Sequence, residues 1–264
     1  MVAATGLHSL LGTPGPLLVM YHGLGGADGL DPGRFEEQLD ALCERRRVVP
    51  LADAVAALGT HAAAELAAIT FDDGYRDFAE LAVPRLARRG LHATLFVPAG
   101  HVGGSNTWDA GNAAPRTILD ASGLRALDSQ TVEIGAHGLS HCRLAGLSRD
   151  ALRAETHDAR LRLEDACGRA LRFFAYPYGQ LDDFDRAAEA AVADAGFEAA
   201  CSTHFGRGSR PPERFRLRRV GFEPKDTLAI VVRKLDGAYD WTAYKERLGA
   251  RVRRLSARPS RERA

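Results

Sequence analysis

Short apolar runs alternate with longer amphipathic segments along this chain, and the alternation continues from residue 16 to about residue 235. Most apolar runs are continuous instead of switching between apolar and polar positions, which is typical of strands covered on both faces of a parallel sheet. Strands separated by helical segments predict parallel βα units. The predicted strands span residues 17–22, 47–51, 67–71, 93–98, 131–137, 171–177, 197–203 and 215–222.

The amphipathic segments carry the signals that begin and end helices. Pro32 stands in the first turn of one segment, where the N–H that proline lacks is not needed. Ser148 is the expected N-cap of a second segment, and Gly168 is its expected stop. The predicted helices span residues 31–46, 148–168 and 183–197. One irregular stretch, residues 99–118, is long enough to be a functional loop.

Composition narrows the class of protein without changing this picture. The chain has 264 residues, of which 45% are hydrophobic and 26% are charged, as in a globular protein with one large α/β domain. A net charge of +1 gives no indication of nucleic-acid binding. The four cysteines are widely spaced and form no Cys-x-x-Cys pair, so we expect reduced thiols rather than a disulfide framework.

The two ends of the chain predict where the protein resides. The first residues lack a basic start, and the apolar run at residues 16–21 is too short for a signal-peptide core or a membrane span. We therefore expect a cytoplasmic protein with a single domain over residues 1–245. Residues 246–264 are rich in arginine and are expected to form a solvated, partly disordered tail that could approach an anionic membrane surface.

Polar residues stand at the C-terminal ends of four predicted strands. They are the adjacent Asp72 and Asp73, the histidines His137 and His141, the Tyr-Pro-Tyr-Gly turn at residues 176–179, and His204. Catalytic groups of a βα barrel collect on the face where the carboxyl ends of the strands meet. We therefore expect these residues to share one site.

The spacing of the two strand-end histidines indicates a metal site. Residues four apart share one side of a helical turn, so His137 and His141 can present two imidazoles to one point. Two imidazoles and a carboxylate suit zinc, iron, cobalt or nickel, and three protein ligands leave positions open for water and substrate. Adjacent strand residues point to opposite faces, so Asp72 and Asp73 cannot both bind one ion without the bend that Gly74 permits. Different roles are expected of the two acids.

Three motifs in this order resemble a known family. Thr-Phe-Asp-Asp-Gly, His-x-x-x-His and Tyr-Pro-Tyr-Gly are similar to the motifs of polysaccharide deacetylases of the NodB-homology group, carbohydrate esterase family four. The resemblance covers roughly residues 15–205, and segments near both ends of the domain are similar to the branch found with exopolysaccharide biosynthesis enzymes. It implies an α/β fold, a distorted (β/α) barrel with fewer than eight βα units, here about seven parallel strands.

The resemblance also implies separate roles for the two acids. In that family the first Asp of the pair is the general base, and the second binds a metal ion with the two histidines. Carried over, Asp72 is the base, and Asp73, His137 and His141 hold one divalent ion, zinc first, with cobalt or nickel as alternatives. Such an ion lowers the pKa of water from 15.7 toward about 7, which provides a nucleophile for amide hydrolysis.

Two further motifs complete the implied machinery. The resemblance makes the backbone N–H of Tyr178, held in place by Pro177, a donor to the oxyanion together with the metal. The last family motif, usually Leu-x-His, reads Ser-Thr-His at residues 202–204. His204 is the implied general acid that protonates the leaving amine.

One departure from the family's pattern removes the usual partner of Asp72. Many members have an Arg two residues before the Pro of the third motif, where it orients the base, and this chain has Ala175 there. An Arg at the end of a buried strand needs a carboxylate, so Arg219 is the expected partner of Asp72. Arg218 stays an alternative, because a one-residue slip of the strand would exchange which of the two points inward.

Two aromatic side chains have two interpretations each. His22 stands at the end of the first predicted strand and either lines the pocket or is a hydrogen-bonded structural residue. Trp108, in the long loop, either stacks on a sugar ring or packs against its own loop.

The leading hypothesis is a metal-dependent hydrolase that removes N-acetyl groups from an N-acetylated sugar in a glycan or glycoconjugate. The alternatives are hydrolysis of a non-sugar amide or an O-acetyl ester on the same scaffold, and a non-catalytic glycan-binding relative. The expected partners are an N-acetylated sugar, an oligosaccharide or a lipid-linked saccharide, and no nucleic acid.

Overall fold

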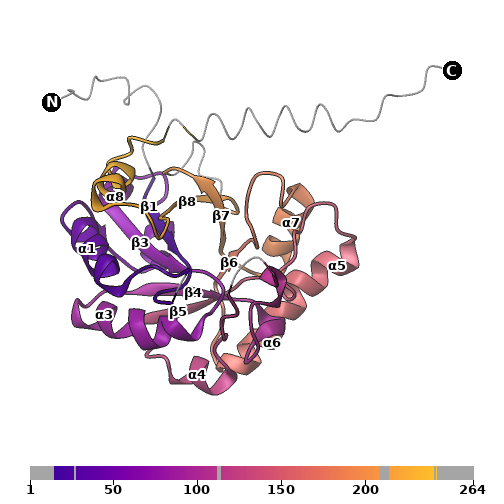
Figure 1. Cartoon of the computed structure of the whole chain (residues 1–264). Coiled ribbons are helices and arrows are strands. Elements are labelled where there is room, and N and C mark those ends of the chain that lie inside the picture. Colours follow the sequence, from indigo (N-terminus) through magenta and orange to yellow (C-terminus); the bar gives the residue numbers. More distant parts are fainter. Residues whose placement is uncertain (1–14, 27, 112–113, 208–213, 241, 243–264) are drawn as a thin grey trace.

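The computed structural model of the chain describes residues 15–26, 28–111, 114–207, 214–240 and 242. Within these residues, seven parallel strands close into a barrel in the order β1-β8-β7-β6-β5-β4-β3, and β3 pairs back with β1 (Figure 1). The barrel strands are β1 (Leu17–Tyr21), β3 (Leu66–Phe71), β4 (Ala93–Val97), β5 (Val132–Ala136), β6 (Phe173–Ala175), β7 (Ala199–Phe205) and β8 (Leu217–Gly221). The expected distorted (β/α) barrel of about seven strands is confirmed.

The remaining strand lies outside the closed barrel. Strand β2 (Arg47–Val48) pairs with the first residues of β3, through Leu66 and Ala67. It is shorter than the predicted strand at residues 47–51, because Pro50 caps the following helix α2 (Leu51–Ala56) instead of extending the strand. Proline lacks the N–H that a longer strand ladder would need.

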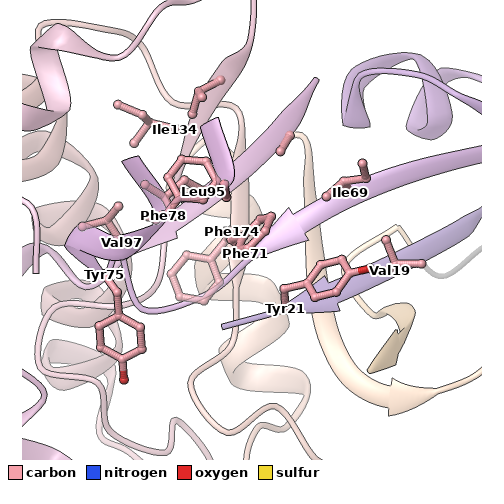
Figure 2. Close-up of a cluster of buried hydrophobic side chains, with 14 of the residues drawn as sticks. Val19, Tyr21, Ile69, Phe71, Tyr75, Phe78, Leu95, Val97, Ile134 and Phe174 are labelled. Atoms are coloured by element: carbon pink, nitrogen blue, oxygen red, sulfur yellow. The ribbon is translucent and has the colours of Figure 1, made fainter. Parts of the chain in front are cut away.

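Side chains of the barrel strands alternate between two apolar clusters. Ile69 and Phe71 of β3 belong to the larger cluster, which also contains side chains of the surrounding helices (Figure 2). Ala68 belongs to the smaller cluster, which includes residues of α2. Because side chains of a strand alternate in direction, Thr70 and Asp72 lie on the same side as Ala68, toward the interior of the barrel. A polar layer therefore follows the apolar residues inside the barrel.

Helices surround the barrel (Figure 1). In addition to α2 they are α1 (Pro32–Cys43), α3 (Val83–Arg88), α4 (Ala121–Ala126), α5 (Arg149–Arg153), α6 (Ala159–Cys167), α7 (Arg186–Asp194) and α8 (Leu228–Leu235). Helix α1 begins as its sequence predicts, with Pro32 in the first turn and an aspartate cap before it. The Asp31 carboxylate accepts hydrogen bonds from the N–H groups of Gly33 and Arg34, both at 2.9 Å, and so satisfies two N–H groups that have no partner within the helix.

The predicted helix at residues 148–168 is not one regular α-helix. A π-helical turn, Ala154–Asp158, separates α5 from α6. Its two expected ends are confirmed: the Ser148 hydroxyl accepts from the Ala151 N–H, and Gly168 has a left-handed φ of 69°. The Thr156 hydroxyl within the π turn donates to the carbonyl oxygen of Leu152 at 2.8 Å, a bond that accompanies local widening of the helix.

The remaining expectations from the sequence concern membrane spans, the cysteines and the C-terminal segment. None of the helices in the described residues is long and apolar enough to cross a membrane. All four cysteines lie in the described part of the chain and carry free thiols. The arginine-rich segment at residues 246–264 lies outside the described residues.

Candidate active site

A cavity of about 200 Å³ opens at the C-terminal ends of the barrel strands. Its lining comes from the segments that follow β1, β3, β4, β5 and β6, and from β7. The lining residues are His22, Asp72, Asp73, Trp108, Asp109, His137, His141, Tyr178 and Thr203. The structure thus brings together the acids and histidines that the sequence places at separate strand ends.

Within the described residues, left-handed backbone at positions other than glycine is found at this cavity. Among the described residues other than glycine, a positive φ occurs at Asp73 (73°), His141 (56°) and Tyr178 (59°), and all three line the cavity. This conformation is unfavourable for a residue with a Cβ atom, and it is typically retained where it directs a functional group. At Asp73, followed by Gly74 with a φ of 69°, the chain turns sharply after β3. The turn lets the two adjacent carboxylates of Asp72 and Asp73 reach one cavity.

Asp73, His137 and His141 direct one ligand atom each toward a common point. Oδ1 of Asp73 lies 3.6 Å from Nε2 of His137 and 3.3 Å from Nε2 of His141. Ligand atoms of a tetrahedral zinc site, each about 2.0–2.1 Å from the ion, stand about 3.3 Å apart. The three buried side chains therefore fit one divalent ion, and their donor set suits zinc, cobalt or nickel.

Neighbouring groups prepare these side chains as ligands. Nδ1 of His137 donates a hydrogen bond to the carbonyl oxygen of Ala175 at 2.7 Å, which leaves the lone pair on Nε2. Burial lowers the pKa of His137 to about 4, so this imidazole is neutral at neutral pH. Burial and the nearby Asp73 carboxylate raise the pKa of Tyr75, so its hydroxyl stays protonated.

Trp108 packs against a predicted metal ligand. Its indole ring is stacked on the imidazole of His141, with ring centroids 4.1 Å apart and an angle of 20° between the planes. A second neighbour is His101 of the same loop, whose ring centroid lies 4.9 Å from that of the indole, with the two ring planes at 81°. Trp108 lines the cavity, but the indole face that meets His141 is not available to a sugar. The contact with His101 agrees with packing against its own loop, and neither interpretation from the sequence includes the stacking on His141.

Asp72 is held by Arg219 in a buried ion pair. Nη1 and Nη2 of Arg219 donate to Oδ1 and Oδ2 of Asp72, both at 2.7 Å, and the two residues are 0% and 1% exposed. Nε of Arg219 donates to the carbonyl oxygen of Ser202 at 2.9 Å, and Nη1 also donates to the hydroxyl of Thr70 at 3.1 Å. The alternation of β8 thus turns Arg219 inward, and the pairing left open between Arg218 and Arg219 is made by Arg219.

Opposing effects set the charge state of Asp72. Burial raises the pKa of its carboxyl group, but the Arg219 guanidinium, His137 and His22 lower the pKa by more. The net shift is downward, so Asp72 is ionised at neutral pH. A carboxylate that is ionised, oriented by two hydrogen bonds and open to the cavity is suited to accept a proton.

The Tyr178 turn forms another wall of the cavity. The carbonyl oxygen of Tyr178 accepts a hydrogen bond from the Thr203 hydroxyl at 2.7 Å, which fixes the left-handed backbone there. Tyr178 is 38% exposed, and its ring contacts the Arg143 guanidinium and the His141 imidazole. Pro177 packs beneath Gly138, where an added Cβ would lie 3.3 Å from Cγ of the proline. Pro177 thereby joins this turn to the segment between His137 and His141.

The two histidines without an assigned ligand role occupy different surroundings. His22 lines the cavity and is exposed. His204 is 3% exposed, and its neighbour Thr203 takes the place in the cavity lining. The pairing of β7 with β8 is irregular between Cys201 and Phe205, so a register deduced from the apolar run alone does not settle which of the two side chains faces the cavity.

Besides Thr203, three residues at or beside the site had no role predicted from the sequence. Asp109, a third carboxylate in the cavity wall, follows Trp108 directly, so the polar loop that suggested Trp108 also contained this signal. Tyr75 directly follows the Asp-Asp-Gly motif, and this position was the available signal. Glu155 lies in the predicted helix at residues 148–168, and its side chain contacts the segment between His137 and His141.

Comparison with known families agrees with this geometry. Residues 60–200 match the polysaccharide deacetylase family. The chain belongs to the polysaccharide deacetylase family. The resemblance deduced from the three motifs is therefore confirmed. YxkH of Bacillus subtilis (strain 168) is 24% identical over 156 residues, which make up 59% of this chain and 51% of YxkH. The aligned part of this family member thus spans about half the length of that relative.

Solved structures of three proteins share the fold of this polysaccharide deacetylase family member. IcaB from Ammonifex degensii is 21% identical, with a TM-score of 0.72 over 86% of this chain and 99% of IcaB. The Streptococcus pyogenes deacetylase PplD, solved in complex with acetate, is 20% identical, with a TM-score of 0.69 over 84% and 98%. A de-N-acetylase from Aggregatibacter actinomycetemcomitans is 15% identical, with a TM-score of 0.67 over 83% and 98%.

Proposed function

We propose that this protein is a metal-dependent hydrolase that removes an N-acetyl group from a sugar in a glycan or glycoconjugate. The observation that carries this proposal is the arrangement of the two acids. Asp73 converges with His137 and His141 on one point, while the adjacent Asp72 reaches the same cavity and is held by Arg219. One cavity thus contains both a site suited to a metal ion and a separate base.

The proposed ligands are Oδ1 of Asp73 and Nε2 of His137 and of His141. A divalent ion bound there supplies Lewis acidity, which polarises the acetyl carbonyl and lowers the pKa of the attacking water. Three protein ligands leave room for water and substrate, as in catalytic rather than structural sites. The neutral His137 and the ionised carboxylate of Asp73 are the ligand forms that such an ion needs.

Asp72 is the proposed acceptor of the proton that the attacking water loses. Arg219 fixes both carboxylate oxygens of Asp72, so the side chain keeps one orientation, with its remaining lone pairs available to the cavity. The same guanidinium keeps Asp72 ionised despite its burial. Orientation and charge are the two properties that a general base requires.

The backbone N–H of Tyr178 is the proposed donor to the oxyanion that forms as water adds to the acetyl carbonyl. The left-handed φ of 59° at Tyr178 sets the direction of this N–H, and the hydrogen bond from Thr203 to the Tyr178 carbonyl oxygen holds the peptide that follows it. A donor fixed in advance stabilises developing charge without having to reorganise during the reaction.

His22 is the proposed donor of a proton to the leaving amine as the C–N bond breaks and acetate forms. It lines the cavity, whereas His204, the donor implied by the family's last motif, is buried beside it. Proton transfer requires the donor within hydrogen-bonding distance of the leaving nitrogen or one water molecule away. The cavity position of His22 meets this requirement more directly.

The experiment that tests the function measures acetate release. The purified chain is freed of metal with a chelator, reloaded with Zn²⁺, Co²⁺ or Ni²⁺, and incubated with N-acetylglucosamine oligomers and with the same oligomers bearing O-acetyl groups. We expect metal-dependent release of acetate and free amines from the N-acetylated oligomers. Release from the O-acetylated oligomers alone would instead support an esterase, and no release with any of these ions from either substrate would overturn the proposal.

A further inference from the structure

The carboxylate of Glu155 is buried beneath the turn that joins the two histidine ligands. Glu155 is 6% exposed and comes from the π turn between α5 and α6. Its Oε2 accepts hydrogen bonds from the N–H groups of Leu139 at 2.8 Å and Ser140 at 3.1 Å. Its Oε1 accepts from the hydroxyl of Ser140 at 2.5 Å. One side chain therefore binds the segment between His137 and His141 through three donors.

We propose that Glu155 is a positioning residue for the metal site, which holds this segment in the shape that makes the two imidazoles converge. This inference rests on the proposed function only in taking His137 and His141 as ligands of one ion. Glu155 touches neither imidazole in the proposed arrangement. It acts through the backbone between them.

The backbone of the segment explains why it needs a partner. Gly138 and His141 both have left-handed φ values, 75° and 56°, so the segment from His137 to His141 has an irregular backbone at two of its five residues. This directs the N–H groups of Leu139 and Ser140 to the same side, where they form a concavity suited to an anion. Without an acceptor, these N–H groups would favour other conformations of the segment, in which His141 no longer faces Asp73.

Space as well as charge couples Glu155 to the segment. A Cβ atom at Gly138 would lie 2.9 Å from Oε2 of Glu155, which leaves no room for a side chain there. The described residues include no Lys or Arg in an ion pair with Glu155, so its carboxylate is stabilised chiefly by donors of the segment it holds. Loss of either partner leaves the other with buried polar groups that lack hydrogen bonds.

The π turn explains how a helical residue reaches the site. A π turn inserts an extra residue into an α-helix and changes the direction of the side chains around it. In this chain it brings Glu155 and Thr156 to buried positions, although both are polar. Such turns occur frequently at functional sites. The irregular helix is therefore part of the architecture that supports the ligands.

The test compares Glu155→Gln and Glu155→Ala with a matched control, Glu164→Gln. Glu164 lies on the neighbouring helix α6, and its carboxylate accepts from the Leu171 N–H at 2.9 Å, so it holds a different segment. For each variant we would measure the dissociation constant for Zn²⁺ against a chelating dye, the visible spectrum of the Co²⁺-loaded protein, and thermal unfolding of the metal-free protein.

Both Glu155 variants should bind Zn²⁺ less tightly, by roughly 10- to 100-fold, as is typical when a residue that supports a metal ligand is lost. Glu155→Ala should have the larger effect, because the Gln side chain still offers one carbonyl oxygen to the two N–H groups. The Co²⁺ spectrum should change in both variants. Glu164→Gln should keep the affinity and the spectrum of the wild type.

An unchanged Zn²⁺ affinity in folded Glu155→Gln would overturn the inference, whatever happens to thermal stability. A change in thermal stability without a change in the Co²⁺ spectrum would show a structural role only. Acetate release is a separate measurement on the wild type. If the wild type released no acetate while Glu155→Gln still weakened metal binding, the proposed function would fail and the positioning role would stand.

Discussion

Arg219 and Asp72 face each other as a two-point ion pair in the interior of the barrel, with both N–O distances at 2.7 Å. The pair joins β8 to the residue after β3, two strands that β1 separates in the barrel. A buried pair of this kind gives each charge its main stabilisation, so removing one partner leaves the other charge in a medium that solvates it poorly.

Arg219→Met should therefore destabilise the protein by about 3–5 kcal/mol, because it leaves the Asp72 carboxylate buried without its cation. The double variant with Asp72→Asn should recover part of that loss, since the remaining side chain is neutral. Urea unfolding of the metal-free proteins measures both effects. Equal destabilisation by the single and the double variant would show that lost packing, rather than the unpaired charge, dominates.

Substitution of His22 should affect turnover, whereas substitution of His204 should affect stability. His22→Ala should lower kcat by a factor on the order of 10²–10⁴, as expected for loss of a proton donor, with little change in metal affinity. His204→Ala removes a buried ring and should lower the unfolding temperature while kcat of the folded enzyme changes little. Acetate-release kinetics and thermal unfolding separate the two. If the His204→Ala enzyme were folded and loaded with metal but did not turn over, His204 and not His22 would be the donor of the proton to the leaving amine.

Glu133, on β5, should make stability depend on pH. Burial raises its pKa to about 7, although Arg172 lowers it, and Glu198 adds to the rise. The folded protein then holds this proton at pH values where the unfolded chain has released it. Stability should therefore decrease as pH rises from about 4.3 to about 7.

Glu133→Gln removes this titration. The free energy of unfolding of the variant, taken relative to that of the wild type, should increase by roughly 1–3 kcal/mol as the pH rises from about 5 to about 8. Urea unfolding at the two pH values measures the difference, with Glu164→Gln as a control. A constant difference between Glu133→Gln and wild type across that range would contradict the raised pKa.

The barrel and much of its site follow from local patterns in the sequence. Continuous apolar runs specify the strands, and the polar residue after each run falls on the same face of a parallel barrel. The inward direction of Arg219 follows from strand alternation, which the inner residues of β8 obey. In these cases one residue's neighbours in the sequence determine where its side chain points.

Other features depend on contacts between distant segments. Trp108 lies in a loop without periodicity, so its stacking on His141 is set by packing and not by any local pattern. Glu155 reaches the histidine segment because of a π turn, which amphipathic spacing does not predict. The positions of Thr203 and His204 depend on an irregular pairing of β7 with β8, which no apolar run reveals.

The most direct test of the account compares Asp72→Asn with Asp73→Asn. Asp73→Asn should weaken Zn²⁺ binding, because a neutral amide oxygen is a poorer ligand beside two imidazoles. Asp72→Asn should keep stoichiometric metal and lose a factor on the order of 10²–10⁴ in kcat for acetate release, because the base is gone. Equal loss of metal in the two variants, or near-normal turnover of Asp72→Asn, would contradict the division of work between the two acids.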